Sequence, residues 1–563
     1  MIYASNDAEY ATIDIISCSV TFFLAGLFFF LLAKRIWIAM TELDISSSLL
    51  AIGHNIVHII PYWARKIYMR KLIVLLLFCA LLTSLFAGGV KEKAEEKDYI
   101  VMAIPVDPDG LDPMATAAAS TFQVTSNIYE TLITVDENGR LLPSLASEWK
   151  VGEDGLSITF TIREGATFSN GKKCTSQEVK NSFLRLKGED SLRYKDYAFI
   201  TGIETPDENT VVFTFSEINV AALSSFAYPW AAVVDSTEEN LKSNPVGTGP
   251  YMLSSWTKNQ SLHLDINPYY NGEVKNDGFI LLVMPDMTAQ VTALAAGEVD
   301  IILITGDLAS TVENKGYNII ASPGNGLQLM AMNNSNEALS DLRVRQAINY
   351  AVDKRALIEA VWWGYGEEIG SHFPVVLKEY IDLSDTYGYD PEKAKALLRE
   401  AGYGEGLTLR MDLPKNYQEY VNAGIVIADS LKKVGITVDI NIVEWAYWLS
   451  EVYVGRNYDL TVVGHTGRLD PYALLVKYIS TGSENYFNYK NSEVDTLLSA
   501  YTTELDENKR TEYIQEIERI LAYEVPALYI QDPIQIYVAK GSVEGFTTFP
   551  INIYKFKDVY REK

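Results

Sequence analysis

The chain has 563 residues, a formal net charge of −26 at pH 7, and a 12% share of aromatic residues. A surface this acidic repels nucleic-acid phosphates and anionic lipid headgroups, so we expect no nucleic-acid partner. The length exceeds what one small core requires, and we expect two or three domains.

Two uncharged apolar runs mark the N-terminal region. The first, Ile15–Ala33, is long enough to span a bilayer. The second, Leu72–Phe86, follows Arg70 and Lys71 and precedes small residues. This basic, apolar and small-residue order is typical of a secretory signal peptide.

Two interpretations stay open for residues 1–68. They form either a transmembrane hairpin that tethers an exported domain, or a mis-assigned extension ahead of a start at Met69. We favour the second, because Met69 begins a complete signal unaided. In both cases we expect a signal peptide at 69–87, a tether at 88–97 and a periplasmic or otherwise extracytoplasmic protein.

Cysteine and histidine usage argues against disulfides and zinc. Cys18 and Cys79 lie in the apolar runs, which leaves Cys174 alone in the exported part. We expect Cys174 to be a buried, inert thiol. The exported histidines, His263, His372 and His465, are widely spaced, so we expect no metal and no cofactor.

The exported part alternates strand and helix patterns. Apolar or alternating runs predict strands near 99–105, 156–163 and 209–216. A helix is predicted over 288–296, ended by Gly297 and followed by a buried strand at 299–304.

Capping residues predict further helices. Ser340 would cap one helix that runs to about Val361. Asp390 and Pro391 would open another, ended by Gly402. Two more helices are expected between about 492 and 522, which makes the fold class α/β in several lobes.

Signatures of catalysis are missing from the sequence. It holds no G-x-S-x-G, no H-E-x-x-H and no phosphate-binding G-x-x-x-x-G-K-[ST] motif. Gly364, Gly366 and Gly370 have the wrong spacing for a dinucleotide fingerprint and are predicted to form a turn. We expect a binding protein, with an exported enzyme as the less favoured alternative.

Several segments in fixed order carry a family resemblance. They are 127–179, NPVGTGPY (244–251), NPYYNG (267–272), 284–301, LRVRQAINYAVDKRAL (342–357), YDPEKAKALLREAGY (389–403) and NYFNYKNSEVDTLL (485–498). With them the chain resembles the extracellular solute-binding proteins of family 5, the dipeptide/oligopeptide-binding type of ABC transporters. The resemblance implies a type II periplasmic-binding-protein fold with two lobes, a hinge and an extra third domain.

The resemblance also implies a domain plan and a task. Lobe I would take 98–332 with an inserted domain at about 125–243, lobe II 333–525, and the chain would return to lobe I over 526–563. Such proteins, expected here as monomers, close on a peptide-like or other small polar solute and deliver it to an ABC permease. Oligosaccharide and metal-chelate ligands stay open as alternatives.

The resemblance maps the ligand cleft to three places. These are the loop after the first strand with Ser120, Thr121 and Phe122, the aromatics Trp230, Trp362 and Trp445, and the loop with His465, Thr466, Arg468 and Asp470. For each tryptophan, core packing is an equal alternative.

One departure from the family pattern bears on the ligand. Peptide binders of the family carry an aspartate, which pairs with the peptide's α-amino group, where this chain has Gly467 and Arg468. An arginine there favours a carboxylate, a sugar hydroxyl array or another anion. A surface arginine paired with one of the many acids is the alternative.

Overall fold

The computed structural model describes residues 98–562 apart from 190 and 552. The leader, signal peptide and tether expected within residues 1–97 lie outside this range. No helix among the described residues is long and apolar enough to cross a membrane.

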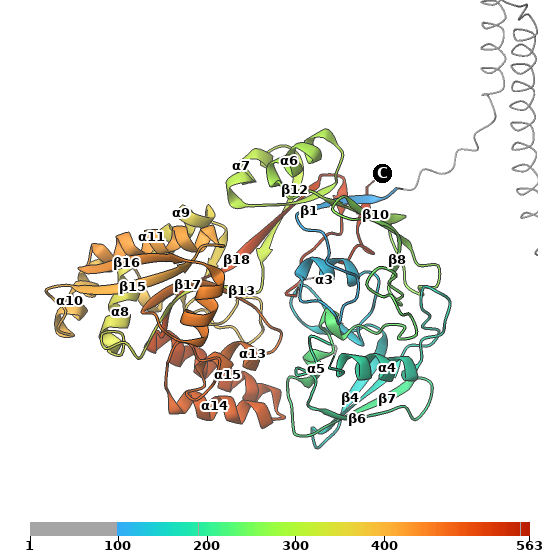
Figure 1. The fold of residues 1–563 in the computed structure, drawn as a ribbon, viewed down its shortest axis with the longest axis horizontal. Helices are drawn as coiled ribbons and strands as arrows, with labels where there is room; N and C mark the ends of the chain where they lie inside the picture. Colours follow the sequence, from blue (N-terminus) through green and yellow to red (C-terminus); the bar gives the residue numbers. More distant parts are fainter. Residues whose placement is uncertain (1–97, 190, 552, 563) are drawn as a thin grey trace, which may run out of the picture. The chain divides into compact units, whose positions relative to one another are not determined.

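Most strands form one twelve-stranded sheet in two halves that share β18 (Ala527–Lys540) (Figure 1). The half that we name lobe I contains β12 (Tyr317–Pro323), β11 (Ile301–Ile304), β1 (Ile100–Ile104), β10 (Gly278–Val283), β9 (Ser261–Ile266) and β8 (Tyr251–Thr257). The half that we name lobe II contains β13 (Gly326–Met332), β17 (Leu460–Thr466), β15 (Leu407–Pro414), β16 (Ile436–Val443) and β14 (Gly366–Glu368).

The lobe II sheet is covered on both faces, which explains its apolar strands. Along β13, Leu327 and Leu329 point into one core and Met330 and Met332 into another. The first core also contains residues of α14 (Ser492–Thr503) and α15 (Glu507–Glu524). The second is covered by α8 (Leu342–Ala351), α9 (Lys354–Trp362), α10 (Pro391–Glu400) and α11 (Gln418–Lys432).

Local signals placed several of these elements correctly. Asp390 accepts a hydrogen bond from the N–H of Lys393 at the start of α10, as predicted. α6 (Met287–Ala296) ends at Gly297, whose φ of 82° lies in the left-handed region that favours glycine. The strands expected near 99–105, 156–163, 209–216 and 299–304 are also confirmed.

The single helix expected from Ser340 to Val361 is wrong. Val352 is extended, and Asp353 accepts a hydrogen bond from the N–H of Ala356, which starts α9 as a separate helix. Asp341 rather than Ser340 caps α8. The apolar stripe continues across the break between α8 and α9, so the spacing of apolar residues predicted one helix instead of two.

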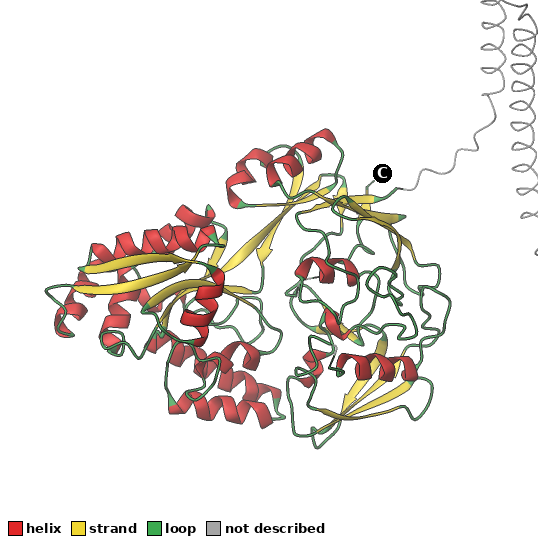
Figure 2. Ribbon diagram, in the orientation of Figure 1, coloured by secondary structure: helices red, strands yellow, loops and turns green. Residues whose placement is uncertain are grey.

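A separate four-stranded sheet lies within the lobe I part of the chain, covered by α4 (Ser176–Leu186) (Figure 2). Its strands are β4 (Ala146–Val151), β5 (Ser157–Ile162), β7 (Thr210–Phe215) and β6 (Ile200–Glu204). Thr175 and Glu178 form a capping box that starts α4. Cys174, just before it, is buried as expected.

Two chain segments connect the lobes, and we call their meeting point the crossover. One is the turn Gly324–Asn325 between β12 and β13, and the other is the part of β18 at Asp532 and Pro533. The carboxylate of Asp532 accepts the N–H of Gly326 at 3.0 Å and that of Val375 at 3.1 Å. Asp532 therefore holds the two segments together.

Candidate functional site

A pocket of about 280 Å³ lies at the crossover and takes its walls from both lobes. Its lining residues are Ala117, Ala119, Phe122, Arg193, Tyr228, Pro229, Trp230, Gly324, Asn325, Thr466, Gly467, Arg468, Pro550 and Ile551. We call it the crossover pocket. Sites between two lobes are a common place for small ligands.

The lobe I wall of the crossover pocket is an aromatic stack that carries an arginine. Trp230 lies parallel to Tyr228, with ring centroids 4.5 Å apart and an interplanar angle of 6°. Phe122 packs against the same tryptophan at 5.5 Å. The Arg193 guanidinium lies 4.3 Å from the Trp230 ring centroid, a cation–π contact that fixes its position.

The lobe II wall is the end of β17 and the loop behind it. Gly467 donates its N–H to the carbonyl of Asn325 at 2.6 Å, which joins this loop to the crossover. The N–H of Leu469 donates to the Tyr228 hydroxyl at 2.9 Å and so connects the two walls. The guanidinium of Arg468 makes no hydrogen bond or ion pair within the described range.

Gly467→Ala should disrupt this wall. A Cβ atom at position 467 would lie 2.0 Å from both the carbonyl oxygen and Oδ1 of Asn325, so the loop must move away. We expect a loss of about 1–3 kcal/mol in unfolding free energy, measured by urea denaturation, together with weaker solute binding. Gly388→Ala is the matched control, since nothing lies within 4 Å of its added Cβ atom. Equal stability of the two variants would contradict the tight approach.

Four of the residues expected at the cleft line the crossover pocket together. They are Phe122, Trp230, Thr466 and Arg468. The neighbours of Phe122 have internal partners, since the Thr121 hydroxyl donates to Asp109 at 2.7 Å and the Ser120 hydroxyl lies 3.5 Å from the Asp107 carbonyl.

Three other expected residues lie elsewhere. Trp362 packs against the lobe II core that α8 to α11 cover. Asp470 is buried, caps α13 (Pro471–Leu475) and accepts the Tyr501 hydroxyl at 3.0 Å. Trp445 belongs to an aromatic row on lobe II that also contains Tyr417, Trp448, Tyr453 and Tyr486.

His465 takes part in a buried chain of hydrogen bonds. Its Nδ1 lies 3.1 Å from Nε2 of His372, and its Nε2 lies 3.1 Å from the Tyr486 hydroxyl. The other ring nitrogen of His372 lies 2.6 Å from the Tyr478 hydroxyl. Burial lowers the pKa of His465 to about 3 and that of His372 well below its usual value. Both rings are therefore neutral and support the end of β17.

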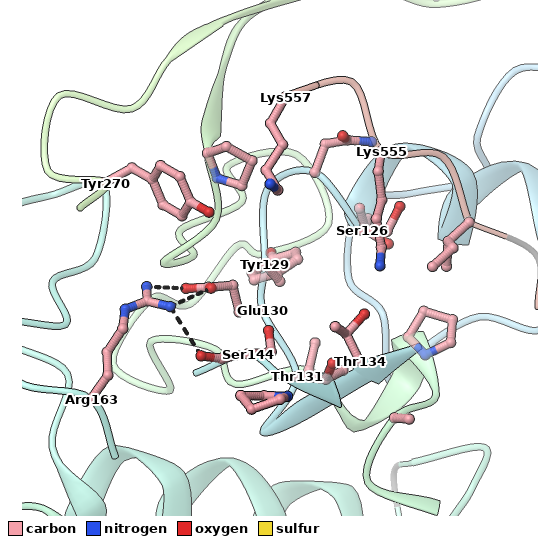
Figure 3. A pocket seen from close by; sticks show the side chains of 18 residues that line it. Ser126, Tyr129, Glu130, Thr131, Thr134, Ser144, Arg163, Tyr270, Lys555 and Lys557 are labelled. Atoms are coloured by element: carbon pink, nitrogen blue, oxygen red, sulfur yellow. Dashed lines mark hydrogen bonds and ion pairs between the residues drawn. The ribbon is translucent and has the colours of Figure 1, made fainter. Parts of the chain in front are cut away.

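A second polar cavity, of about 270 Å³, lies within lobe I (Figure 3). Two of its charged lining residues, Arg163 and Glu130, pair with each other. Arg163 holds Glu130 through two hydrogen bonds of 2.7 and 2.6 Å and also donates to the Ser144 carbonyl. Lys555 donates to the carbonyl of Val135 at 2.7 Å. This cavity is away from the crossover and takes no residue from lobe II.

Arg193, Tyr228 and Asn325 are among the residues of the crossover pocket that sequence reasoning missed. Arg193 lies in a run of turns between α4 and β6 and belongs to no motif. Asn325 sits at a crossover that only the pairing of β18 with β12 and β13 creates. Tyr228 is the exception, because its position two residues before Trp230 was a usable signal.

Comparisons with known proteins identify the family. Residues 140–486 match the family described as bacterial extracellular solute-binding proteins, family 5 Middle. The chain is 26% identical over 538 residues to the dipeptide-binding protein of Escherichia coli K12, which covers 88% of this chain and 99% of that one. It is 26% identical over 517 residues to heme-binding protein A of Haemophilus influenzae, with coverages of 83% and 93%.

A solved structure agrees with this assignment. The PBP AgaA from A. tumefaciens R10, in complex with agropinic acid, has a TM-score of 0.65 and 27% identity and covers 83% of this chain and 99% of its own. The expected α/β fold class and the family resemblance are thereby confirmed. The chain belongs to the family 5 bacterial extracellular solute-binding proteins.

Proposed function

We propose that the protein is the extracytoplasmic receptor of an ABC importer, which captures a small polar, peptide-like solute and delivers it to a membrane permease. The carrying observation is the crossover pocket, whose walls come from both lobes at the point where two chain segments connect them. A solute that contacts both walls favours the arrangement in which the lobes lie closest together.

The crossover is suited to act as a hinge. The turn between β12 and β13 consists of Gly324 and Asn325, and Asn325 has a φ of 51°. The opposite segment at Asp532 and Pro533 lies between the residues of β18 that pair with β13 and those that pair with β12, and it pairs with the short strand β14. Hinges are typically a few element-terminal residues that absorb a change in φ and ψ. We infer that the protein works as a monomer without a catalytic step or cofactor.

The lobe II aromatic row supports a second type of cargo. Trp445 stacks on Trp448 at 4.9 Å with an interplanar angle of 4°, and Tyr417 packs edge-on against Trp445. Partly exposed stacked rings can bind the flat faces of sugars. An oligosaccharide is therefore the alternative ligand, and the relatives named for dipeptides, heme and agropinic acid show that the family accepts varied ligands, metal chelates included.

Solution scattering tests hinge closure. The solute that co-purifies with the protein is first removed and then added back. We expect the radius of gyration to fall when the solute is added back, because the lobes close over it. A solute that does not raise the melting temperature serves as the control and should leave the curve unchanged. An unchanged radius at saturating co-purified solute would contradict the proposed function.

A further inference from the structure

The crossover pocket has a charge opposite to that of the whole chain. The chain has a formal net charge of −26, yet the described residues that line this pocket include two arginines and no aspartate or glutamate. A concave site of one sign concentrates the field of its charges and attracts ligands of the other sign. The pocket is thus a local positive site on an acidic protein.

Arg468 supplies the first positive charge. Its backbone is held from two sides, since its carbonyl accepts Asn325 Nδ2 at 3.4 Å and Leu469 binds the Tyr228 hydroxyl. Arg468 is partly exposed, and its guanidinium has no partner among the residues that the structure describes, so its five N–H donors are available to a ligand. Lys477 lies near it, and burial together with the charge of Arg468 lowers the pKa of Lys477 despite an ion pair with Glu484.

Arg193 supplies the second positive charge from the opposite wall. Its side chain is only 22% exposed, and its nearest acid, Asp196, lies 3.6 Å from Nη1, beyond good hydrogen-bonding distance. Its Nε atom is buried without a hydrogen bond. The Trp230 ring beneath it and the Tyr228 ring stacked on Trp230 hold the guanidinium in place. The aromatic stack therefore presents an arginine.

We propose that the solute carries an oxyanion, a carboxylate or a chemically similar group, that binds Arg193 from one lobe and Arg468 from the other. This inference rests on the proposed function and names its ligand class. A guanidinium matches such a group with two parallel hydrogen bonds. A free ammonium group finds no carboxylate among the described lining residues, and Trp230 already contacts both Tyr228 and Arg193.

The arrangement also couples binding to closure. One anion that touches both arginines neutralises two like charges that would otherwise repel each other as the lobes approach. Without the anion, this repulsion favours separated lobes. The solute thus changes the sign of an interaction between the two walls.

Calorimetric titration of the purified full chain tests the ligand class. The probes are citrate, inorganic phosphate, the dipeptide Ala-Gln, the same dipeptide with an amide in place of its C-terminal carboxylate, and cellobiose. We expect binding of the carboxylate probes, with Ala-Gln stronger than its C-terminal amide, and no binding of cellobiose. Binding of phosphate without binding of the carboxylate probes would support an oxyanion ligand and identify it as a phosphate rather than a carboxylate. Mass spectrometry of the solute that co-purifies should show an acid.

Substitutions of the two arginines test whether they bind the oxyanion. Arg468→Gln and Arg193→Gln should each weaken binding of the tightest anionic probe by about tenfold to a hundredfold. Arg468→Lys should restore part of the loss, since it keeps the charge but not the planar fork. Arg519→Gln is the matched control, because Arg519 pairs with Glu516 on the surface of α15 and should bind the probe like the parent. Melting temperatures of the solute-free variants near that of the parent show that they fold.

The outcomes separate this inference from the proposed function. Tight binding of cellobiose, of the amidated dipeptide or of a co-purified solute without an oxyanion, unchanged in both arginine variants, would overturn the oxyanion and leave hinge capture intact. Failure of every probe and of the co-purified solute to bind, with scattering unchanged, would remove both.

Discussion

Phe213→Ala should lower the free energy of unfolding of the part of lobe I that is built on the sheet β4–β5–β7–β6 by about 3–5 kcal/mol. Phe213 is fully buried at the centre of a ring cluster, with centroid distances of 4.8 Å to both Phe183 and Phe226 and 5.9 Å to Phe160. Removing its ring leaves a cavity that the surrounding strands and helix cannot refill.

Urea denaturation measures the loss, and solute titration shows its functional consequence. Arg193 follows α4 and Trp230 follows α5 (Ala222–Ser225), so both depend on this core for their positions. Leu184→Ala is the control. Leu184 follows Phe183 on α4 but is 52% exposed, so its truncation should change stability little. A Phe213→Ala protein as stable as the control would mean that the ring cluster does not support the domain.

Stability should also fall as the pH rises from about 6.5 to 8, a range in which the buried His372 and His465 are largely neutral in both the folded and the unfolded state. Burial raises the pKa of Glu518 to about 8, although the 2.9 Å hydrogen bond from the Ser371 hydroxyl lowers this pKa in part. Burial also raises the pKa of Asp532 to about 7. In this range the folded state holds protons that the unfolded state has released. Linkage therefore requires the free energy of unfolding to decrease with increasing pH.

Glu518→Gln isolates one contribution. The variant keeps the shape and the neutral state, so it should lose part of the pH dependence and exceed the parent's stability at pH 9, by on the order of 3 kcal/mol. Denaturation curves at pH 5, 7 and 9 measure this. Glu516→Gln is the control, because the Glu516 side chain is 47% exposed and pairs with Arg519. Parallel pH profiles of Glu518→Gln and the parent would contradict an ionisation of Glu518 in this range.

Short-range chemistry accounts for what the sequence could predict. The cap at Asp390 and the left-handed Gly297 act within one helical turn, so their residues alone indicate where α10 begins and α6 ends. The break between α8 and α9 was hidden because Asp353 can cap a helix only when Val352 leaves the helical conformation. That choice depends on packing as well as on the local sequence.

The residues of the crossover pocket also differ in whether the sequence could predict them. The family pattern predicted Thr466 and Arg468, which line the crossover pocket at the end of β17 and in the loop that follows it. Arg193 reaches the pocket only because a ring stack built from Tyr228 and Trp230 receives it. No residue near Arg193 in the sequence signals that contact.

The position of β18 has a consequence for how the chain folds. This strand pairs with β13 in one lobe and with β11 and β12 in the other, and it lies close to the C-terminus. During synthesis, both half-sheets therefore keep an open edge until almost the whole chain has emerged. Contacts so distant in sequence form slowly. A chain that cannot close either core early stays unfolded for longer, and losing β18 would leave two incomplete lobes rather than one.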